Sequence, residues 1–308
     1  MDGATSTYLA NAFKQLGHSF LHYPYRHFAL LHGLERMNED FVQAAQESDL
    51  TIVLKGEMLN PKVVGVLRQA GTRLAVWHLD PWNGRADWVL DIAREAPKFL
   101  TTAKGLLPDY KAQGADAHWV LEGCDPDVHK PPSRDLGPAG VNFPVSFVGT
   151  TAASEREEWL LGLRQRFRGD LHVFGSFPGS LAGSNHHGRA EEYCGLKGDA
   201  GLSWVVGHST VNLGRDRSPK IERSYGARLF RTLAAGGYLV TNHTLGIKED
   251  FPGCVAVYND LDDCERLIRW GLERHNERRR MARRGQKKVL TEHTFKNRAA
   301  EILKVMGL

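Results

Sequence analysis

The sequence predicts an α/β protein with two similar domains, each built on a parallel sheet. Short apolar segments alternate with longer amphipathic ones, which is the pattern of strands connected by helices. This alternation stops at a segment rich in proline and glycine, residues 130–142, and then starts again. The chain has 308 residues, which is enough for two domains of about 150 residues each.

The composition is that of an ordinary globular protein, with 42% hydrophobic and 25% charged residues. A net charge of +4 suits an anionic ligand such as a nucleotide and also permits nucleic acid. The four cysteines are far apart and form no CxxC pair, so we expect neither a zinc site nor disulfides. No apolar run approaches the length of a membrane span and the N-terminus lacks a signal pattern, so a cytoplasmic protein is expected.

The first domain is expected over residues 1–130. It starts with a loop at residues 2–7 and a helix that Gly17 ends, and a strand is expected at residues 18–25. Helices and strands then alternate as in a parallel sheet. The expected helices are 41–47, 61–69, 86–94 and 106–113, and the expected strands are 50–54, 73–77, 98–102 and 118–121.

A linker over residues 131–142 leads to a second domain at residues 143–290, and the segment 291–308 carries a last helix that could pack back on the first domain. Residues 176–201 are glycine-rich and expected to be irregular. A cleft between the two domains is the natural place for a ligand. The expected strands are 145–149, 171–175, 203–206, 210–213, 238–241 and 255–258, and the expected helices are 155–167, 228–235, 261–274, 278–290 and 296–306.

The segment that begins at Arg228 is central to the functional interpretation. Apolar residues at helical spacing predict a helix, which Gly236 and Gly237 end because glycine accepts the left-handed cap conformation. A short buried strand follows, and Asn242 lies at its carboxyl end, with Glu249 in the next loop. Ligands bind at the carboxyl ends of strands in open α/β sheets, so we expect a ligand site here.

The order of motifs resembles that of the CgeB-like glycosyltransferases over roughly residues 45–305. The resemblance implies the GT-B architecture, in which two Rossmann-like domains with parallel sheets face each other across a cleft. It implies that the second domain holds a nucleotide-sugar donor, that the first holds the acceptor, and that no catalytic metal is needed. The motifs are Trp77-x-x-Asp80-Pro81, Phe147-Val148-Gly149-Thr150 with Arg156 soon after, a Val-Phe-Gly strand ending at Gly175, Arg228-x-Phe230 before Gly236-Gly237, Glu249-Asp250-Phe251, and Arg298 in the last helix.

One residue departs from the pattern of this family. Members usually carry a glutamate after the phenylalanine of the helix, where it can accept hydrogen bonds from the ribose of the donor, but this chain has Arg231. An arginine cannot accept a hydrogen bond. Ribose recognition must then come from elsewhere, or the donor is unusual, and Glu249 remains available for the sugar or the ribose.

Transfer of a sugar from a nucleotide builds negative charge on the leaving diphosphate. Without a metal, cationic side chains and helix N-termini must stabilise this charge. A basic segment around a helix start expected at Ser218-Pro219 could meet this demand. Lys220, Arg223 or Arg228 is expected to contact phosphate, and a solvated basic face is the alternative. That alternative has similar weight for Arg215 and Arg217.

Backbone amides at strand ends are further candidates for donor binding. Gly149 and Thr150 follow the first strand of the second domain, and Gly175 follows the second strand. Their N–H groups would lie beside the donor, although a simple strand-to-helix turn explains the glycines as well. The loop at residues 2–7 could also approach the phosphates, or it could be a frayed terminus.

The acceptor hydroxyl must lose a proton, and Asp80 at the end of a strand is the main candidate for the base. His78 is the second candidate because the pKa of a free histidine lies near neutrality. Asp80 before Pro81 could instead form a turn or a helix cap. Trp77 and Trp82 could line an acceptor pocket or belong to the core.

Two further groups of residues have side chains that could bind ligands. His186 and His187 with Cys194 fit no standard metal set, and no metal site is expected. The basic run at residues 274–288 could bind a phosphate backbone, although such runs usually form the solvated face of a helix.

The favoured function is therefore transfer of a sugar from a nucleotide sugar, most simply a UDP-sugar, to an acceptor hydroxyl, with no other cofactor. The acceptor could be a small molecule, a polysaccharide, a protein, or a hydroxymethylated base in DNA, as in phage-type DNA glycosyltransferases. A non-catalytic module that binds nucleotide sugars is the remaining alternative, and Arg231 is the residue that favours it.

Overall fold

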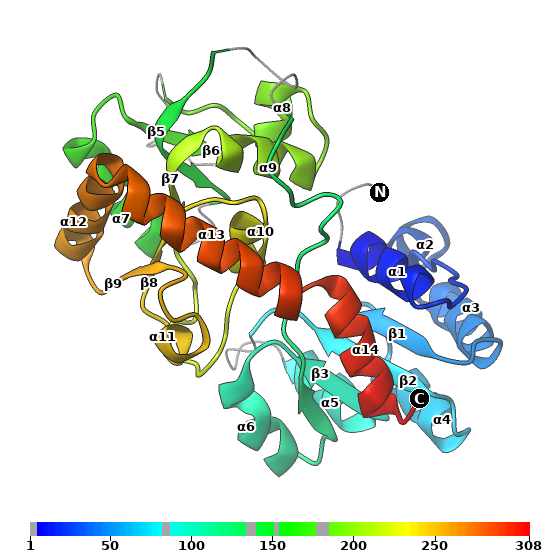
Figure 1. The fold of residues 1–308 in the computed structure, drawn as a ribbon. Coiled ribbons are helices and arrows are strands. Elements are labelled where there is room, and N and C mark those ends of the chain that lie inside the picture. Colours follow the sequence, from blue (N-terminus) through cyan, green and yellow to red (C-terminus); the bar gives the residue numbers. More distant parts are fainter. Residues whose placement is uncertain (1–4, 82–86, 134–139, 151–153, 177–184) are drawn as a thin grey trace. The chain divides into compact units, whose positions relative to one another are not determined.

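The computed structural model describes residues 5–81, 87–133, 140–150, 154–176 and 185–308 (Figure 1). The chain forms two compact units, each with one parallel sheet, and this confirms the predicted α/β fold class. Unit 1 comprises Met1–Tyr8, Gly123–Pro219 and Gly226–Phe295, and unit 2 comprises Leu9–Glu122, Lys220–Tyr225 and Lys296–Leu308. The domain boundaries drawn from the sequence stay a prediction.

The sheet of unit 2 has four parallel strands in the order β1-β2-β3-β4. The strands are β1 (Thr51–Leu54), β2 (Leu74–His78), β3 (Lys98–Thr101) and β4 (Ala117–Trp119). The helices along this part of the chain are α1 (Thr5–Gln15), α2 (Tyr25–His32), α3 (Leu34–Gln46), α4 (Pro61–Gln69), α5 (Asp87–Glu95), the 3₁₀ turn η1 (Lys104–Leu106), α6 (Leu107–Ala112) and, after unit 1, α14 (Phe295–Met306).

Strand β2 is at the centre of the unit 2 core. All five of its residues are buried, and Trp77 pairs with Leu54 of β1 on one side and Leu100 of β3 on the other. A parallel strand buried on both faces reads as a continuous apolar run, as it does here. Helix α4 starts where the sequence indicates, because the Asn60 side chain accepts a hydrogen bond from the Lys62 amide (3.0 Å) and Pro61 fits the first helical position.

The sheet of unit 1 has five parallel strands in the order β6-β5-β7-β8-β9. The strands are β5 (Phe143–Val148), β6 (Leu171–Phe174), β7 (Ser209–Gly214), β8 (Leu239–Asn242) and β9 (Ala256–Tyr258). The helices are α7 (Ser154–Arg166), α8 (Ala190–Cys194), α9 (Asp199–Gly207), α10 (Ala227–Ala234), α11 (Ile247–Asp250), α12 (Leu261–Glu273) and α13 (His275–Glu292).

Helices cover both faces of the unit 1 sheet. Helices α7 and α12 share one apolar core with the strands, and α9 and α10 contact the strands elsewhere (Figure 1). Strand β5 pairs with β6 on one side and β7 on the other, so the chain changes direction along the sheet at β5. Ligands of open α/β sheets bind outside the carboxyl ends of the strands at such a switch point. The carboxyl ends of β5 and β7 are therefore the place to look for a site.

Several expected elements differ in the structure. The helix expected at residues 41–47 begins earlier, as α3, and the segment 176–201, expected to be irregular, contains helix α8. Residues 18–24 form no strand, and helix α2 follows them directly. The apolar run at residues 203–206, expected as a strand, belongs to helix α9, since a short run buried on all sides has no diagnostic period. Residues 215–226 are irregular, so Ser218-Pro219 starts no helix, and α10 begins only after Gly226.

Candidate functional site

Two arginines converge at the switch point of the unit 1 sheet. The guanidinium groups of Arg156 and Arg228 lie 5.9 Å and 4.6 Å from the centre of the Phe147 ring, near the end of β5. Arg156 is fixed because it donates hydrogen bonds to the backbone carbonyls of Thr150 (2.6 Å) and Arg215 (2.8 Å). These bonds join the loops after β5 and β7 around the two cations.

The electrostatics of this cluster favour an anion. Burial and then the neighbouring charge of Arg156 lower the pKa of Arg228 to about 10. Burial and the charge of Arg217 lower the pKa of Arg156 as well. Burial raises the pKa of Asp216, although Arg228 and the Gly226 amide oppose this shift. An anion that binds here would relieve the repulsion between the arginines.

The backbone around the cluster permits close approach. A Cβ atom at Gly149 would overlap the Arg228 guanidinium, so the absence of a side chain leaves room for that cation. Arg228 also lies in the first turn of α10, and the N-terminus of a helix favours negative charge. Of the sequence-predicted donor residues, Gly149, Thr150 and Arg228 therefore do come together.

Asn242 supports the cluster instead of pointing at a ligand. Its side chain is buried, accepts a hydrogen bond from the Asp216 amide (2.7 Å) and donates one to the Asp216 carbonyl (3.3 Å). Asp216 in turn accepts a hydrogen bond from the Gly226 amide (3.1 Å) at the start of α10. Asn242 thus fixes the loop that carries Asp216, and it acts as a support residue.

Several predicted donor residues lie outside the cluster. Lys220 and Arg223 belong to unit 2, where Lys220 is exposed and Arg223 forms an ion pair with Glu222 (2.6 Å). Glu249 is exposed on helix α11. The Gly175 carbonyl accepts a hydrogen bond from the His186 ring (2.9 Å).

Gly236 and Gly237 have a structural role at the opposite edge of the sheet. They end helix α10 and precede β8, whereas the cluster lies at the carboxyl ends of the strands. Gly236 has a φ of 79°, and the Gly237 amide donates to the Thr232 carbonyl at 3.0 Å, as in a glycine-capped helix end. A Cβ at Gly237 would press against Val206 and Asn212. The two glycines therefore lie away from the arginine cluster, and their role in donor binding stays a prediction.

Arg231 has an acidic partner within unit 1. Its guanidinium donates to Asp199 Oδ2 at 2.9 Å and to the Thr5 hydroxyl at 3.2 Å. The same Asp199 oxygen accepts a hydrogen bond from the Tyr8 hydroxyl (2.8 Å) and lies 3.1 Å from His129 Nε2. Burial would raise the pKa of Asp199, but its bond to His129 and the charge of Arg231 lower it. Arg231 therefore belongs to a half-buried structural network.

The two candidate bases lie in unit 2 at the end of β2. Asp80 is 63% exposed at its side chain and forms an ion pair with Lys55, 2.6 Å between Nζ and Oδ2. His78 is buried, and burial lowers its pKa. Trp77 is fully buried and donates to the Val120 carbonyl (3.1 Å), so it belongs to the core and lines no pocket. Trp82 and residues 2–4 of the expected phosphate loop lie outside the described residues.

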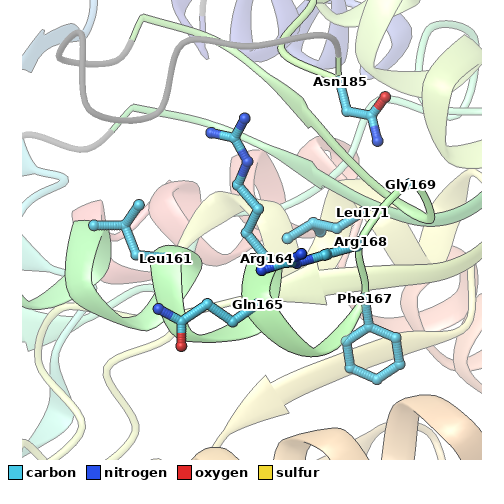
Figure 2. A pocket seen from close by; sticks show the side chains of 8 residues that line it. All are labelled: Leu161, Arg164, Gln165, Phe167, Arg168, Gly169, Leu171 and Asn185. Carbon is cyan, nitrogen blue, oxygen red and sulfur yellow. The ribbon is translucent and has the colours of Figure 1, made fainter.

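The structure also has a pocket of about 470 Å³ on unit 1 (Figure 2). It lies between the end of α7 and the start of β6, where Leu171 is the first strand residue. This is the amino-terminal edge of the sheet, opposite the arginine cluster. The pocket is lined by Leu161, Arg164, Gln165, Phe167, Arg168, Gly169, Leu171 and Asn185.

Among the described residues, no three His, Cys, Asp or Glu side chains gather closely enough to hold a metal ion. His187 instead lies 2.8 Å from the His172 ring nitrogen, and the Cys194 thiol donates to the Ala190 carbonyl (3.0 Å). The described helices also include none with the length and apolar character that crossing a bilayer requires.

Sequence reasoning missed two members of the cluster. Arg156 appeared only as part of the resemblance, and its signal was its place shortly after the strand that ends at Gly149. Asp216 stood among five basic residues and carried no signal of its own. The ion pair between Arg231 and Asp199 also had no signal in the sequence.

Known proteins were compared with the chain. Residues 156–304 match the family model described as "Glycosyl transferase-like", and no curated protein matches the sequence. Sucrose-phosphate synthase from Thermosynechococcus elongatus superposes with a TM-score of 0.68 at 14% identity, covering 98% of this chain and 92% of that one. Anabaena HepE in complex with UDP-glucose gives 0.66 at 13% identity, covering 100% and 96%.

A third similar structure is the UDP-forming α,α-trehalose-phosphate synthase from Burkholderia vietnamiensis, with a TM-score of 0.60 at 12% identity, covering 98% of this chain and 84% of that one. Identities this low establish the fold alone. The family match covers the part of the chain that holds the arginine cluster. The family match thus covers just under half of the chain, whereas the fold shared with these structures extends over nearly all of it.

Proposed function

We propose that this protein transfers a sugar from a UDP-sugar to an acceptor hydroxyl. The observation that carries the proposal is the pair of arginines, Arg156 and Arg228, at the switch point of the unit 1 sheet. Two cations beside a helix N-terminus, the buried Arg156 and the half-buried Arg228, suit a diphosphate, whose charge increases as the bond to the sugar breaks. The similar structure of HepE was obtained with UDP-glucose, and the similar trehalose-phosphate synthases are UDP-forming.

In this proposal the cations stabilise the leaving group without a catalytic metal. The two guanidinium groups and the start of α10 face the developing charge on the diphosphate. The exposed Glu249 remains the candidate for hydrogen bonds to the sugar or ribose. Asp80 takes the proton of the acceptor hydroxyl, because it is a carboxylate exposed at a strand end, whereas His78 is buried.

The test is a thermal-shift and calorimetry screen with UDP, UDP-glucose, ADP and GDP. UDP at a hundred times its Kd is expected to stabilise the protein by about 2.7 kcal/mol. Stabilisation by UDP and UDP-glucose above ADP and GDP supports the proposal. Addition of EDTA is expected to leave sugar transfer unchanged. If none of these nucleotides binds at millimolar concentration, the proposal is wrong.

A second candidate acceptor is a modified base in DNA, and helix α13 is the feature that favours it. Five arginines and a lysine are exposed along or beside this helix, while Ala282, Gly285 and Val289 turn inward. Such a basic face suits a phosphate backbone. Binding to a DNA duplex that weakens steeply with salt would support it, and binding independent of salt would exclude it. The exposed cations are Arg274, Arg279, Arg280, Arg283, Arg284 and Lys287.

A non-catalytic module that binds nucleotide sugars is the remaining alternative. It depended on Arg231, which stands where an acid was expected and is taken up by Asp199 and Thr5. Hydrolysis of UDP-glucose by the protein alone would exclude a purely binding role.

A further inference from the structure

The backbone at the end of strand β1 has an unusual conformation. Lys55 has a φ of 70°, and Gly56 after it has a φ of 88°. The left-handed region is unfavourable for a side chain such as lysine, whereas glycine or asparagine adopts it at lower cost. Residues held in this way against their preference cluster at functional sites.

Contacts from two elements hold this turn in place. The Lys55 amide donates to the Trp77 carbonyl of β2 at 2.9 Å. The Tyr25 hydroxyl of α2 accepts a hydrogen bond from the Gly56 amide (3.2 Å) and lies 2.8 Å from Glu57 Oε2. The origin of the Lys55 side chain is therefore fixed relative to the end of β2, where Asp80 lies.

The side chain of Lys55 reaches Asp80, with 2.6 Å between Nζ and Oδ2. The two side chains are 37% and 63% exposed, and ion pairs this open to solvent contribute little to stability. The conformation of the lysine backbone is itself unfavourable. Stability therefore does not account for the arrangement, which points to a role in function.

We propose that Lys55 is a positioning residue that orients the Asp80 carboxylate, an inference that rests on the proposed function. Lys55 holds Oδ2, so that Oδ1 faces the acceptor. Oδ1 takes the hydroxyl proton while the acceptor oxygen forms its bond to C1 of the sugar. The bond between C1 and the diphosphate oxygen breaks, and its electron pair leaves with UDP. Asp80 then releases the proton to solvent.

The test measures UDP release from UDP-glucose with water as the acceptor, in a double-mutant cycle. Lys55→Met is expected to lower kcat about tenfold or more while the KM for UDP-glucose changes by less than about twofold, because orientation is lost and donor binding is not. Lys55→Arg keeps a cation and is expected to recover most of the rate. In an Asp80→Asn background, Lys55→Met is expected to cause no further loss.

Two further variants separate positioning from folding. Lys55→Gly removes the backbone conflict, so it is expected to melt at the same or a higher temperature and still lose activity. Lys62→Met replaces an exposed lysine on α4 and is expected to keep the wild-type rate. Equal kcat values for wild type and Lys55→Met, or additive losses with Asp80→Asn, would overturn the inference.

The failure of the inference can be told from failure of the proposed function. If UDP-glucose is turned over normally by Lys55→Met, only the inference about Lys55 fails. If the wild type binds UDP but releases none from UDP-glucose, or if Asp80→Asn keeps full activity, the role of Asp80 fails and that of Lys55 fails with it. If UDP does not bind at all, the proposed function itself is wrong.

Discussion

At the scale of single residues, the candidate donor site depends on charges held where they repel one another. Arg156 and Arg228 both lie close to the Phe147 ring near the end of β5. Burial lowers both pKa values, and a neighbouring charge adds to each shift, that of Arg217 for Arg156 and that of Arg156 for Arg228. Such an arrangement is unfavourable in the free protein and favourable once an anion binds. The affinity of the site for a diphosphate should therefore depend steeply on each arginine.

The first prediction concerns Arg228→Met. Loss of a charge-assisted contact of about 1.5–3 kcal/mol should weaken UDP binding by roughly tenfold to a hundredfold, as measured by isothermal calorimetry. Arg283→Met, at an exposed arginine of α13, is the matched control and should bind UDP like the wild type. Equal affinities in the two variants would show that Arg228 does not contact the diphosphate.

At the scale of elements, the Asp199 network ties α9 to α10 and to the first turn of α1. One carboxylate oxygen meets Tyr8, His129 and Arg231. The partners stand 191, 70 and 32 positions from Asp199 in the sequence. A buried ion pair contributes little to the free energy of unfolding. Removing one partner is nevertheless strongly destabilising, because the other charge stays buried without its counter-charge.

The second prediction concerns Asp199→Asn, which leaves the Arg231 cation half-buried without its counter-charge. The free energy of unfolding in urea should fall by about 3 kcal/mol. Asp262→Asn, which removes an exposed carboxylate paired with Arg166, should change it by less than about 0.5 kcal/mol. Adding Arg231→Met to Asp199→Asn should restore part of the loss. Similar losses from Asp199→Asn and Asp262→Asn would contradict this role.

The third prediction concerns the pair His172 and His187 beside β6, whose ring nitrogens lie 2.8 Å apart. Burial, and then the charges of His172 and His186, lower the pKa of His187 to about 4, and burial lowers that of His172. The folded state thus favours neutral rings. A histidine in the unfolded chain has a pKa of about 6.5. At pH values between about 6.5 and about 4, the unfolded chain therefore binds more protons than the folded protein. This contribution to stability is complete above that range and is lost as the pH falls through it.

Urea unfolding of the wild type at pH 7 and at pH 4.5 checks this sign. The wild type should lose about 2 kcal/mol from this pair between the two conditions, and His187→Gln should lose clearly less. His32→Gln, at an exposed histidine, serves as the control and should follow the wild type. The same pH dependence in all three proteins would remove the histidine pair as the cause.

Elements with strong local signals were predictable from the sequence, and those fixed by distant contacts were not. Helix α4 has the expected bounds because Asn60 and Pro61 set its start. Helix α9 was expected as a strand because Trp204 and its valine neighbours are buried on all sides. The site shows the same division. Arg228 follows from its motif, whereas the pairing of Arg231 with Asp199 depends on tertiary contacts that no local pattern encodes.

At the scale of the whole molecule, the two parallel sheets follow from the alternation in the sequence, but the compact units are not continuous in the chain. Unit 2 is formed by three separate segments, the last of which is Lys296–Leu308. Within that segment Ala299 and Ile302 are buried, and Arg298 donates to the Glu122 carbonyl at 3.1 Å. The sequence predicted a helix here that could pack back on the first domain, and the segment belongs to the same compact unit as residues 9–122.

The fourth prediction concerns removal of this segment. A chain that ends at Phe295 should lose about 2–4 kcal/mol of unfolding free energy in urea, because buried apolar area and the Arg298 contact are lost from unit 2. A chain that ends at Met306 removes only the last two residues, which are exposed, and should unfold like the full chain. Full stability of the shorter chain would show that α14 is dispensable.

The division of unit 2 among three segments also bears on how the protein is made. Helix α14 follows all of unit 1 in the sequence. While a ribosome is still adding the residues of unit 1, unit 2 lacks Ala299 and Ile302, which are buried in the folded chain. Apolar surface left open during synthesis is where chaperones bind and where nascent chains associate. The β1–β4 sheet is thus synthesised before most of unit 1, whereas unit 2 is completed only after unit 1.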